Sequence, residues 1–171
     1  MNEIQIRSAS MKDLDAILTI QALCYTEVEP ESAQSMGAKL AAAPDSCFVA
    51  EYQGRVVAYL LSLPWLLHQL LTLNSPECQL PQQPDCFYLH DLAVAPVGRK
   101  LGAGRALIQA FFTALTQAGL DVACLVAVQG SGDYWQRWGF VVQQPDAELQ
   151  HKLNSYGEGV EYRVWSRESV F

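Results

Sequence analysis

The feature that most constrains the fold is a succession of three segments between residues 86 and 128. CFYLHDLAV has the apolar pattern of a strand, and LGAGRALIQAFFTALTQAG has the periodicity of a helix that ends near Gly119. LDVACLVAV is an almost uninterrupted apolar run, which is typical of a buried strand. A strand, a crossover helix and a second strand predict a parallel pair within one sheet.

The N-terminal part of the chain predicts a strand followed by two helices. EIQIRSA alternates apolar and polar residues, and Ser10 then takes the N-cap position before the helical segment MKDLDAILTIQALCY. The apolar face of this helix is expected to carry Leu14, Ile17, Leu18 and Leu23. After the polar, turn-prone stretch TEVEPES, the segment SAQSMGAKLAAA predicts a second, shorter helix.

The remaining segments predict antiparallel strands around the parallel pair. CFVAEY and RVVAYLLSL form a hairpin that turns at Gln53 and Gly54 and ends at Pro64. Residues 64–85 are a long excursion, in which WLLHQLLTL could form a turn or two of helix and the rest is loop-like. DYWQRW predicts a short helix, and GFVVQ and VEYRVWS predict the last strands.

Composition favours one globular domain over residues 1–171. Hydrophobic residues make up 50% of the 171 residues and charged residues 17%, which is unlike a disordered or fibrous chain. MNEIQIRSASMKD lacks the apolar core of a signal peptide, and no stretch reaches the roughly 18 to 20 apolar residues that span a bilayer. We therefore expect a cytoplasmic protein without a membrane partner.

The charged and metal-binding residue types exclude several classes of function. The five cysteines are an odd number without a CxxC pair, which argues against a disulfide framework and a structural zinc site. Cys78, Cys86 and His90 are irregularly spaced and lack an evident fourth ligand, so we expect no metal. The net charge of −7 argues against nonspecific nucleic-acid binding and suits a cationic partner such as an amine.

The turn between the first strand and the helix of the parallel unit reads RKLGAGRAL, residues 99–107. A helix N-terminus presents unpaired backbone N–H groups and the positive end of the helix dipole, and glycines allow an anion to approach the backbone. This turn therefore predicts a phosphate-binding site. A P-loop is excluded because no Gly-Lys-Ser/Thr follows Gly98 at the required spacing, and a dinucleotide fingerprint is excluded because Leu107 stands at its third glycine.

The order of segments from Phe87 to Phe140 resembles that of the GNAT superfamily of acyl-CoA-dependent N-acyltransferases. Residues 99–104 match its Arg/Gln-x-x-Gly-x-Gly/Ala motif, and Tyr134-Trp135-x-x-x-Gly139-Phe140 follows in the family order. Within the superfamily, YLHDLAV and the insertion before it are most similar to the arylalkylamine (serotonin) N-acetyltransferases and their small bacterial relatives.

The resemblance implies a GNAT fold of class α/β (α+β). This fold has a central mixed, mostly antiparallel sheet of six to seven strands flanked by helices, with acetyl-CoA bound where two parallel strands splay apart. The strand backbone, the pyrophosphate loop, the amide at the usual asparagine position and an indole beside the sulfur would hold the cosubstrate. The corresponding residues here are Leu92, Ala93, Val94, Arg99, Lys100, Leu101, Gly102, Ala103, Gly104, Arg105, Gln129 and Trp135.

N-acetylation needs a base, because an amine with a pKa near 10.4 is almost wholly protonated at neutral pH and cannot attack a thioester. His90 has the intrinsic pKa for this task and precedes the pyrophosphate loop. Strand alternation predicts Tyr88, His90 and Leu92 on one face of the strand, with Leu89, Asp91 and Ala93 on the other. A hydrogen-bonded core histidine is the alternative interpretation of His90.

The departing CoA thiolate gains from a proton donor. The family usually supplies a tyrosine four residues before the glycine of its Gly-Phe pair, but that position is Trp135 in this sequence. Indole N–H is too weak an acid to release a proton. Tyr134 and Tyr88 are therefore the candidate acids, and Tyr25 is a further alternative donor.

The acceptor amine is predicted only by analogy with the family. CYTEVEPES and the 64–85 insertion should border its site and supply Tyr25, Glu27, Glu29 and Trp65. Acidic and aromatic groups suit an amine through charge pairing and cation–π contact, but a solvated turn and a core or homodimer contact at Trp65 are equally compatible. A small free amine, a peptide N-terminus and a lysine side chain all stay open.

The sequence thus predicts an acetyl-CoA-dependent N-acetyltransferase that works by direct attack in a ternary complex. A noncatalytic acyl-CoA-binding sensor or partner protein on the same fold is the alternative, favoured by the tryptophan at position 135.

Overall fold

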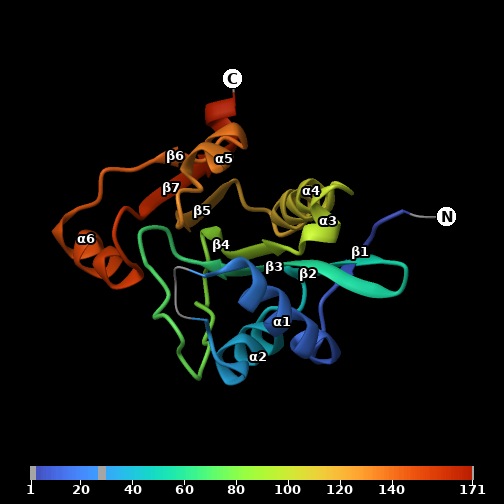
Figure 1. Ribbon diagram of the computed structural model, residues 1–171. Coiled ribbons are helices and arrows are strands. Elements are labelled where there is room, and N and C mark those ends of the chain that lie inside the picture. The colour runs from blue at the N-terminus through green and yellow to red at the C-terminus, as the bar shows by residue number, and fades with distance from the viewer. Residues whose placement is uncertain (1–2, 27–29, 171) are drawn as a thin grey trace.

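The computed structural model describes residues 3–26 and 30–170, which form a twisted sheet with helices on both faces (Figure 1). Within this part of the chain the sheet has seven strands in the order β1-β2-β3-β4-β5-β7-β6. The neighbours β4 and β5 run parallel and the other neighbouring pairs run antiparallel. The strands are β1 Gln5–Ser8, β2 Cys47–Tyr52, β3 Arg55–Trp65, β4 Cys86–Val94, β5 Val122–Ala127, β6 Val141–Val142 and β7 Glu161–Ser166. The predicted mixed, mostly antiparallel sheet is confirmed.

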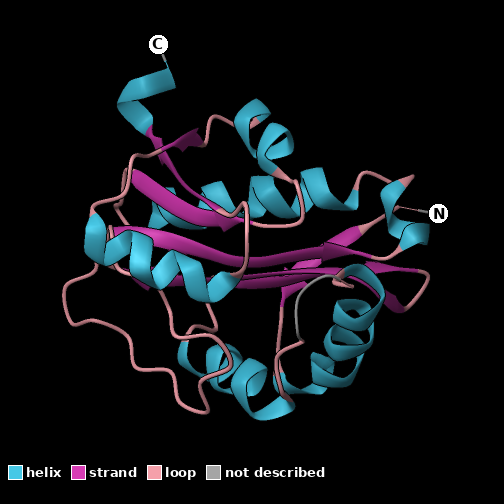
Figure 2. Ribbon diagram, turned by 60° about the vertical axis from the view of Figure 1, so that its left-hand side comes forward, coloured by secondary structure: helices cyan, strands magenta, loops and turns pink. Residues whose placement is uncertain are grey.

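The helices divide the core into two layers, one on each face of the sheet (Figure 2). The helices α1 (Leu14–Cys24), α2 (Ala33–Ala42) and α6 (Ala147–Leu153) pack on one face. The helices α3 (Pro96–Arg99), α4 (Ala103–Gln117) and α5 (Gly132–Arg137) pack on the other. Short 3₁₀ turns complete the set: η1 Met11–Asp13, η2 Asn154–Tyr156 and η3 Arg167–Val170. No helix in the ranges 3–26 and 30–170 combines the length and apolarity needed to cross a membrane.

Three local expectations from the sequence were wrong. Leu23 is 59% exposed, because the buried stripe of α1 runs through Ile17, Ile20 and Gln21. Residues 66–85 contain no helix. Strand β3 continues through Pro64 to Trp65, where it still pairs with β4. On its other side β2 pairs with β3 only as far as Leu61, and no other strand of the described residues pairs with β3 beyond that point. Proline is tolerated at such an edge, where its missing N–H is not needed for a ladder bond.

Strand β4 carries one extra residue in its middle. Across the β3–β4 pair, Leu61 lies opposite Asp91 while the next residue, Ser62, lies opposite Leu89. His90 is therefore the extra residue of a β-bulge. A bulge of this kind bends the strand and shifts the two-residue alternation of side chains by one.

The bulge overturns the face assignment made from simple alternation. Asp91 and Ala93 lie on the α1 side of the sheet together with Tyr88, whereas Leu92 lies on the α4 side. The prediction was therefore wrong for the three residues after His90. As a consequence, two consecutive ionisable side chains, His90 and Asp91, point to the same face.

Strands β4 and β5 separate soon after they meet. Their pairing covers Phe87 opposite Ala123 and Tyr88 opposite Cys124. Beyond these two pairs, β5 continues to Ala127 and bonds to β7, while β4 continues to Val94 and bonds to β3. The two parallel strands therefore open toward the N-terminus of α4.

Gly139 allows the chain to leave α5 and enter β6. Its φ of +93° is in the left-handed region, and a Cβ atom built on it would lie 2.9 Å from Cδ1 of Trp165. Gly159 has a φ of +70° but nothing within 4 Å of its Cβ position. The two glycines thus separate the cost of backbone strain from that of a side-chain clash.

We predict that Gly139→Ala lowers the melting temperature more than Gly159→Ala. Gly159→Ala, the control, should lower the free energy of unfolding by about 1–2 kcal/mol, because alanine disfavours a left-handed backbone. Gly139→Ala should lower it further, because the indole of Trp165 also has to move. Thermal unfolding followed by circular dichroism measures both. Equal losses would contradict the packing described for Gly139.

Candidate active site

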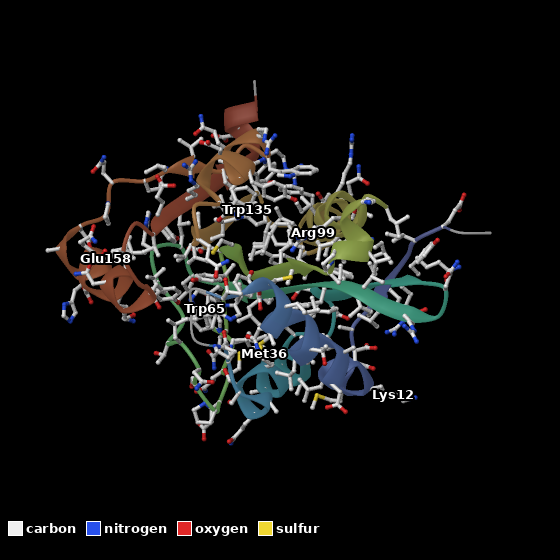
Figure 3. The ribbon with its side chains drawn as sticks, viewed as in Figure 1. Lys12, Met36, Trp65, Arg99, Trp135 and Glu158 are labelled. Atoms are coloured by element: carbon white, nitrogen blue, oxygen red, sulfur yellow. The ribbon has the colours of Figure 1, made fainter. Side chains whose placement is uncertain are left out.

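A cavity of about 990 Å³ occupies the opening between β4 and β5. Its walls come from the end of α1, from β4 and β5, from the start of α4, from α5, and from segments at 30–31, 73–74 and 155–157. Figure 3 shows Arg99 and Trp135 on the α4 side of the sheet, and Trp65 and Met36 on the α1 side. Because the lining includes both the start of α4 and His90, one continuous space joins the N-terminus of α4 to His90.

The α4 end of the cavity is formed by backbone groups. Gly102, with a φ of +74°, precedes the first residue of α4, and the N–H of Ala106 donates to the carbonyl of Gly102 at 3.1 Å. The N–H groups of Ala103, Gly104 and Arg105 lie before this first helical bond and point out of the helix end. They can receive an anion together with the positive end of the helix dipole.

The predicted loop residues divide between cavity and scaffold. Arg99, Gly102, Gly104 and Arg105 line the cavity, whereas Lys100, Leu101 and Ala103 do not. The N–H of Leu101 donates to the carbonyl of Gly98 at 3.1 Å, which removes it from the set that can hold a ligand. The Arg99 guanidinium donates through Nε to the carbonyl of Val94 at 3.0 Å, so Arg99 also fixes the end of β4.

Beyond the pairing with β5, the backbone of β4 is directed into the opening. The carbonyl of Leu92 accepts a hydrogen bond from the Tyr25 hydroxyl at 2.9 Å, and that of Val94 accepts one from Arg99. A strand residue points its N–H and C=O to the same side. The N–H groups of Leu92 and Val94 therefore face the open edge, whereas Ala93, between them, faces β3. An extended ligand could add to this edge as a strand does.

His90 lies at the bulge, at the opposite end of the cavity from α4. Its side chain is 5% exposed, and Nε2 is hydrogen-bonded to Oε1 of Glu31. No group in the described part of the chain bonds to Nδ1, although this atom is buried. The two ring nitrogens of His90 therefore differ: Nε2 contacts a carboxylate, and Nδ1 has no partner among the described residues.

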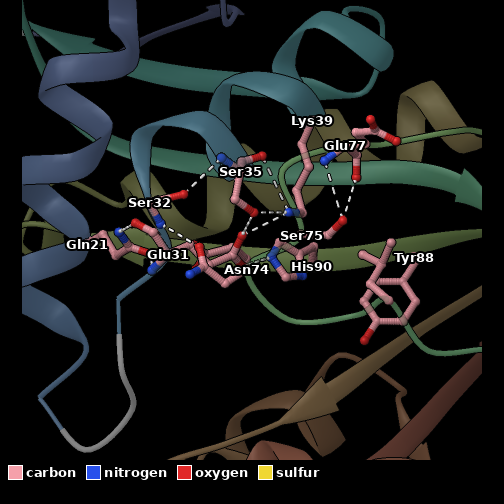
Figure 4. Close-up of polar contacts among 12 residues, drawn as sticks. Gln21, Glu31, Ser32, Ser35, Lys39, Asn74, Ser75, Glu77, Tyr88 and His90 are labelled. Carbon is pink, nitrogen blue, oxygen red and sulfur yellow. Dashed lines mark hydrogen bonds and ion pairs between the residues drawn. The ribbon is translucent and has the colours of Figure 1, made fainter.

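Glu31 is half-buried and contacts both His90 and Lys39, as Figure 4 shows. Its Oε2 accepts hydrogen bonds from Lys39 Nζ at 2.8 Å and from the Ser35 hydroxyl at 2.7 Å. Burial acts to raise the pKa of Glu31, but the neighbouring His90 and Lys39 outweigh it and hold the pKa well below its usual range. Glu31 is therefore a carboxylate at every physiological pH.

Asp91 and two tyrosines form a second buried polar group behind β4. The Tyr59 hydroxyl donates to Oδ2 of Asp91 at 2.7 Å, and no described residue bonds to Oδ1. Burial raises the pKa of Asp91, against the lowering effects of His90 and of the hydrogen bond from Tyr59. Burial likewise raises the pKa of Tyr25.

The two candidate acids lie at different ends of the cavity. The Tyr88 ring centroid is 6.2 Å from that of His90, and its hydroxyl is 3.3 Å from the hydroxyl of Tyr156. Tyr134 lies at the other end, where a Cβ atom built on Gly104 would be 3.3 Å from its hydroxyl. Burial raises the pKa of both Tyr88 and Tyr134, so both hydroxyls stay protonated at neutral pH.

The remaining predicted residues are placed as follows. Trp135 lines the cavity and packs edge-on against Phe140. Gln129 also lines it, and its amide donates to the carbonyl of Cys24 at 3.3 Å. Trp65 does not line the cavity, and its indole N–H donates to the carbonyl of Gln69 at 3.0 Å. The predicted acceptor residues Glu27 and Glu29 lie outside the described residues.

Glu31 was not among the residues predicted from the sequence, although it lies in the polar segment TEVEPES. Glu31 directly precedes Ser32, whose hydroxyl caps α2 by accepting from the N–H of Ser35 at 3.1 Å. This position indicates that Glu31 lies at the start of a helix but not that it contacts His90. Gln21 fixes the Glu31 backbone from α1 by accepting from its N–H and donating to its carbonyl. Only the tertiary fold singles out this glutamate from its neighbours in sequence.

The model of the Acetyltransferase (GNAT) family matches residues 14–140, which include α1, the opening between β4 and β5, and α5. The chain belongs to the GNAT family. A search of curated protein sequences gives no match. The finer resemblance to the arylalkylamine N-acetyltransferases stays a prediction.

Solved structures share the fold at low sequence identity. The loading GNATL domain of CurA from Lyngbya majuscula is 13% identical with a TM-score of 0.77, over 98% of this chain and 99% of that one. The GphF GNAT-like decarboxylase in complex with isobutyryl-CoA is 18% identical with a TM-score of 0.67, over 95% and 99%. The ribosomal-protein-S18-alanine N-acetyltransferase from Escherichia coli is 17% identical with a TM-score of 0.66, over 95% and 93%.

We predict that Gly104→Val weakens CoA binding at least tenfold without destabilising the protein. The new side chain would meet Tyr134 beside the N-terminus of α4 and obstruct the anion-binding N–H groups. The stability of the helix should not fall, because valine, although a modest helix former, is better than glycine in a helix. Isothermal titration calorimetry with CoA gives the dissociation constant. Gln109→Val adds the same side chain at an exposed position of α4 and should bind CoA normally. Equal affinities for the two variants would remove Gly104 from the site.

Proposed function

We propose that this GNAT protein transfers an acetyl group from acetyl-CoA to a primary amine, with His90 as the general base. The observation that carries the proposal is the cavity lined both by the start of α4 and by His90, whose buried Nδ1 has no hydrogen-bond partner among the described residues. Such a cavity brings a phosphate-bearing donor and a proton acceptor to opposite ends of one site. The acceptor amine is a small molecule, a peptide N-terminus or a lysine side chain.

The residues present fit coenzyme A as a cosubstrate. The α4 N-terminus, Arg99 and Arg105 hold the pyrophosphate, and the open edge of β4 holds the pantetheine arm. From Val94 back to His90 the strand spans about 13 Å, at about 3.3 Å per residue. An extended pantetheine arm bridges this distance and brings the thioester to the bulge. Trp135 and Gln129, which line the same space, complete the cosubstrate site.

The protein's groups then divide the reaction among them. Nδ1 of His90 takes the proton of the acceptor ammonium, directly or through water, so that the amine nitrogen can attack the thioester carbonyl. The N–H of Leu92 faces the open edge and donates to the oxygen that gains negative charge. Tyr88 gives a proton to the departing thiolate. We assign this role to Tyr88 because it is the neighbour of His90, whereas Tyr134 is at the pyrophosphate end.

An acceptor panel tests the function. With acetyl-CoA and a set of arylalkylamines, polyamines and short peptides, release of free CoA thiol is followed with DTNB. We expect at least one amine to accelerate thiol release and to appear as its N-acetyl product by mass spectrometry. If calorimetry shows acetyl-CoA binding but no acceptor stimulates thiol release, the protein is an acyl-CoA sensor or partner protein and the proposal fails.

His90→Ala should reduce turnover with the best acceptor by about 10²–10⁴-fold at neutral pH. The loss should shrink at alkaline pH, because the free-base fraction of the amine rises without help from the protein. The pH–rate profiles of both proteins check this. His151→Ala removes an exposed histidine on α6 and should behave as the unmodified protein does. Unchanged turnover in His90→Ala would exclude His90 as the base.

A further inference from the structure

Lys39 is a buried cation in an otherwise apolar stretch of α2. Its side chain is 2% exposed and lies between the buried residues Met36 and Leu40 in sequence. Burying an ammonium group costs several kcal/mol, and an apolar side chain of similar volume would avoid this cost. The lysine is therefore expected to serve a purpose other than packing.

The Lys39 ammonium bonds to Glu31, the residue that contacts His90, and to Ser35. Nζ donates to Oε2 of Glu31 at 2.8 Å and to the Ser35 hydroxyl at 2.9 Å, and that hydroxyl itself donates to Oε2 of Glu31. The other carboxylate oxygen of Glu31 meets Nε2 of His90. Lys39, Glu31 and His90 thus form one line of contacts, and Figure 4 shows both Lys39 and His90 reaching the Glu31 carboxylate.

The charges of Lys39 and Glu31 determine which protonation state of His90 is favoured. Lys39 and Glu31 together are neutral, so the pair does not require a proton on both nitrogens of the imidazole. The carboxylate oxygen can only accept a hydrogen bond. A neutral His90 therefore places its one proton on Nε2, facing Glu31, and leaves the lone pair on Nδ1. If Lys39 were absent, the buried carboxylate would be balanced most easily by an imidazolium, which cannot act as a base.

We propose that Lys39 and Glu31 are positioning residues that keep His90 neutral, with its proton on Nε2 and Nδ1 as the proton acceptor. Glu31 orients the ring, and Lys39 neutralises Glu31 so that the orientation does not require a protonated ring. The catalytic meaning of this arrangement rests on the proposed function, but the charge state of His90 can be measured in the protein without any substrate.

Other titratable groups face this line of contacts and are the same in every variant tested. Asp91 lies beside His90 on β4, and the hydroxyls of Tyr88 and Tyr156 lie on its cavity side. Cys47 and Cys78 lie near Lys39, and burial raises the pKa of both thiols. The thiols and phenols are therefore neutral between pH 5 and 8, and burial raises the pKa of Asp91 as well.

The test is a pH titration of His90 by nitrogen-15 NMR in protein labelled at its three histidines, with His90→Gln to assign the signal. In the unmodified protein the neutral ring should carry its proton on Nε2. Lys39→Met removes a nearby positive charge, so the titration midpoint of His90 should rise by about one pH unit or more. Glu31→Gln leaves the ammonium uncompensated, so the midpoint should fall by a similar amount.

Two further variants make the outcome decisive. Lys12→Met removes a positive charge from an exposed position and should leave the His90 midpoint in place. The double variant Lys39→Met/Glu31→Gln removes both charges and should return the midpoint toward that of the unmodified protein. If Lys39→Met does not fold, Glu31→Gln and the double variant decide the matter. Midpoints that do not move in opposite directions, or a neutral ring protonated on Nδ1, would overturn the inference.

Activity separates this inference from the proposed function. With an accepted amine, the acid limb of the pH–rate profile should move to higher pH in Lys39→Met and to lower pH in Glu31→Gln. A purely structural role would lower turnover without moving the limb. If the NMR midpoints shift as expected but no amine is acetylated, the proposed function fails and the charge arrangement stands. If an amine is acetylated but neither midpoint shifts, the charge arrangement fails alone.

Discussion

The extra residue in β4 is the constraint on which the rest of the site depends. Without the bulge at His90, the strand would alternate regularly and Asp91 would lie under α4, away from Tyr59. With it, His90 meets Glu31 on the α1 side, and the backbone of Leu92 faces the gap left by β5. A local irregularity in one strand thus places His90 on the same strand as the open edge at Leu92.

Much of the fold followed from the sequence because its elements have strong local signals. The periodicity of α4, the apolar run of β5 and the turn at Gln53 and Gly54 each specify an element without reference to the rest of the chain. The bulge has no such signal. Nothing in the letters YLHDLAV distinguishes a regular strand from one that pairs Leu61 and Ser62 with residues two positions apart, because the choice depends on how β3 packs against it.

The candidate site was predictable in proportion to how local its parts are. The glycine loop before α4 and the histidine on β4 could be named because each sits in a recognisable segment. Glu31 and Lys39 could not, because the contact between Glu31 and His90 joins residues 59 positions apart and exists only once α2 has docked on the sheet. Charged side chains in a polar turn or a helix give no sign from sequence that they will be buried.

The two ends of the cavity differ in the kind of group that lines them. The cosubstrate end uses backbone N–H groups at α4 and along β4, which nearly any side chain leaves intact. The His90 end uses specific side chains from three segments, namely His90, Glu31 and Lys39. A substitution is therefore expected to disturb the first end less than the second. Structures only 13–18% identical to this chain share its fold.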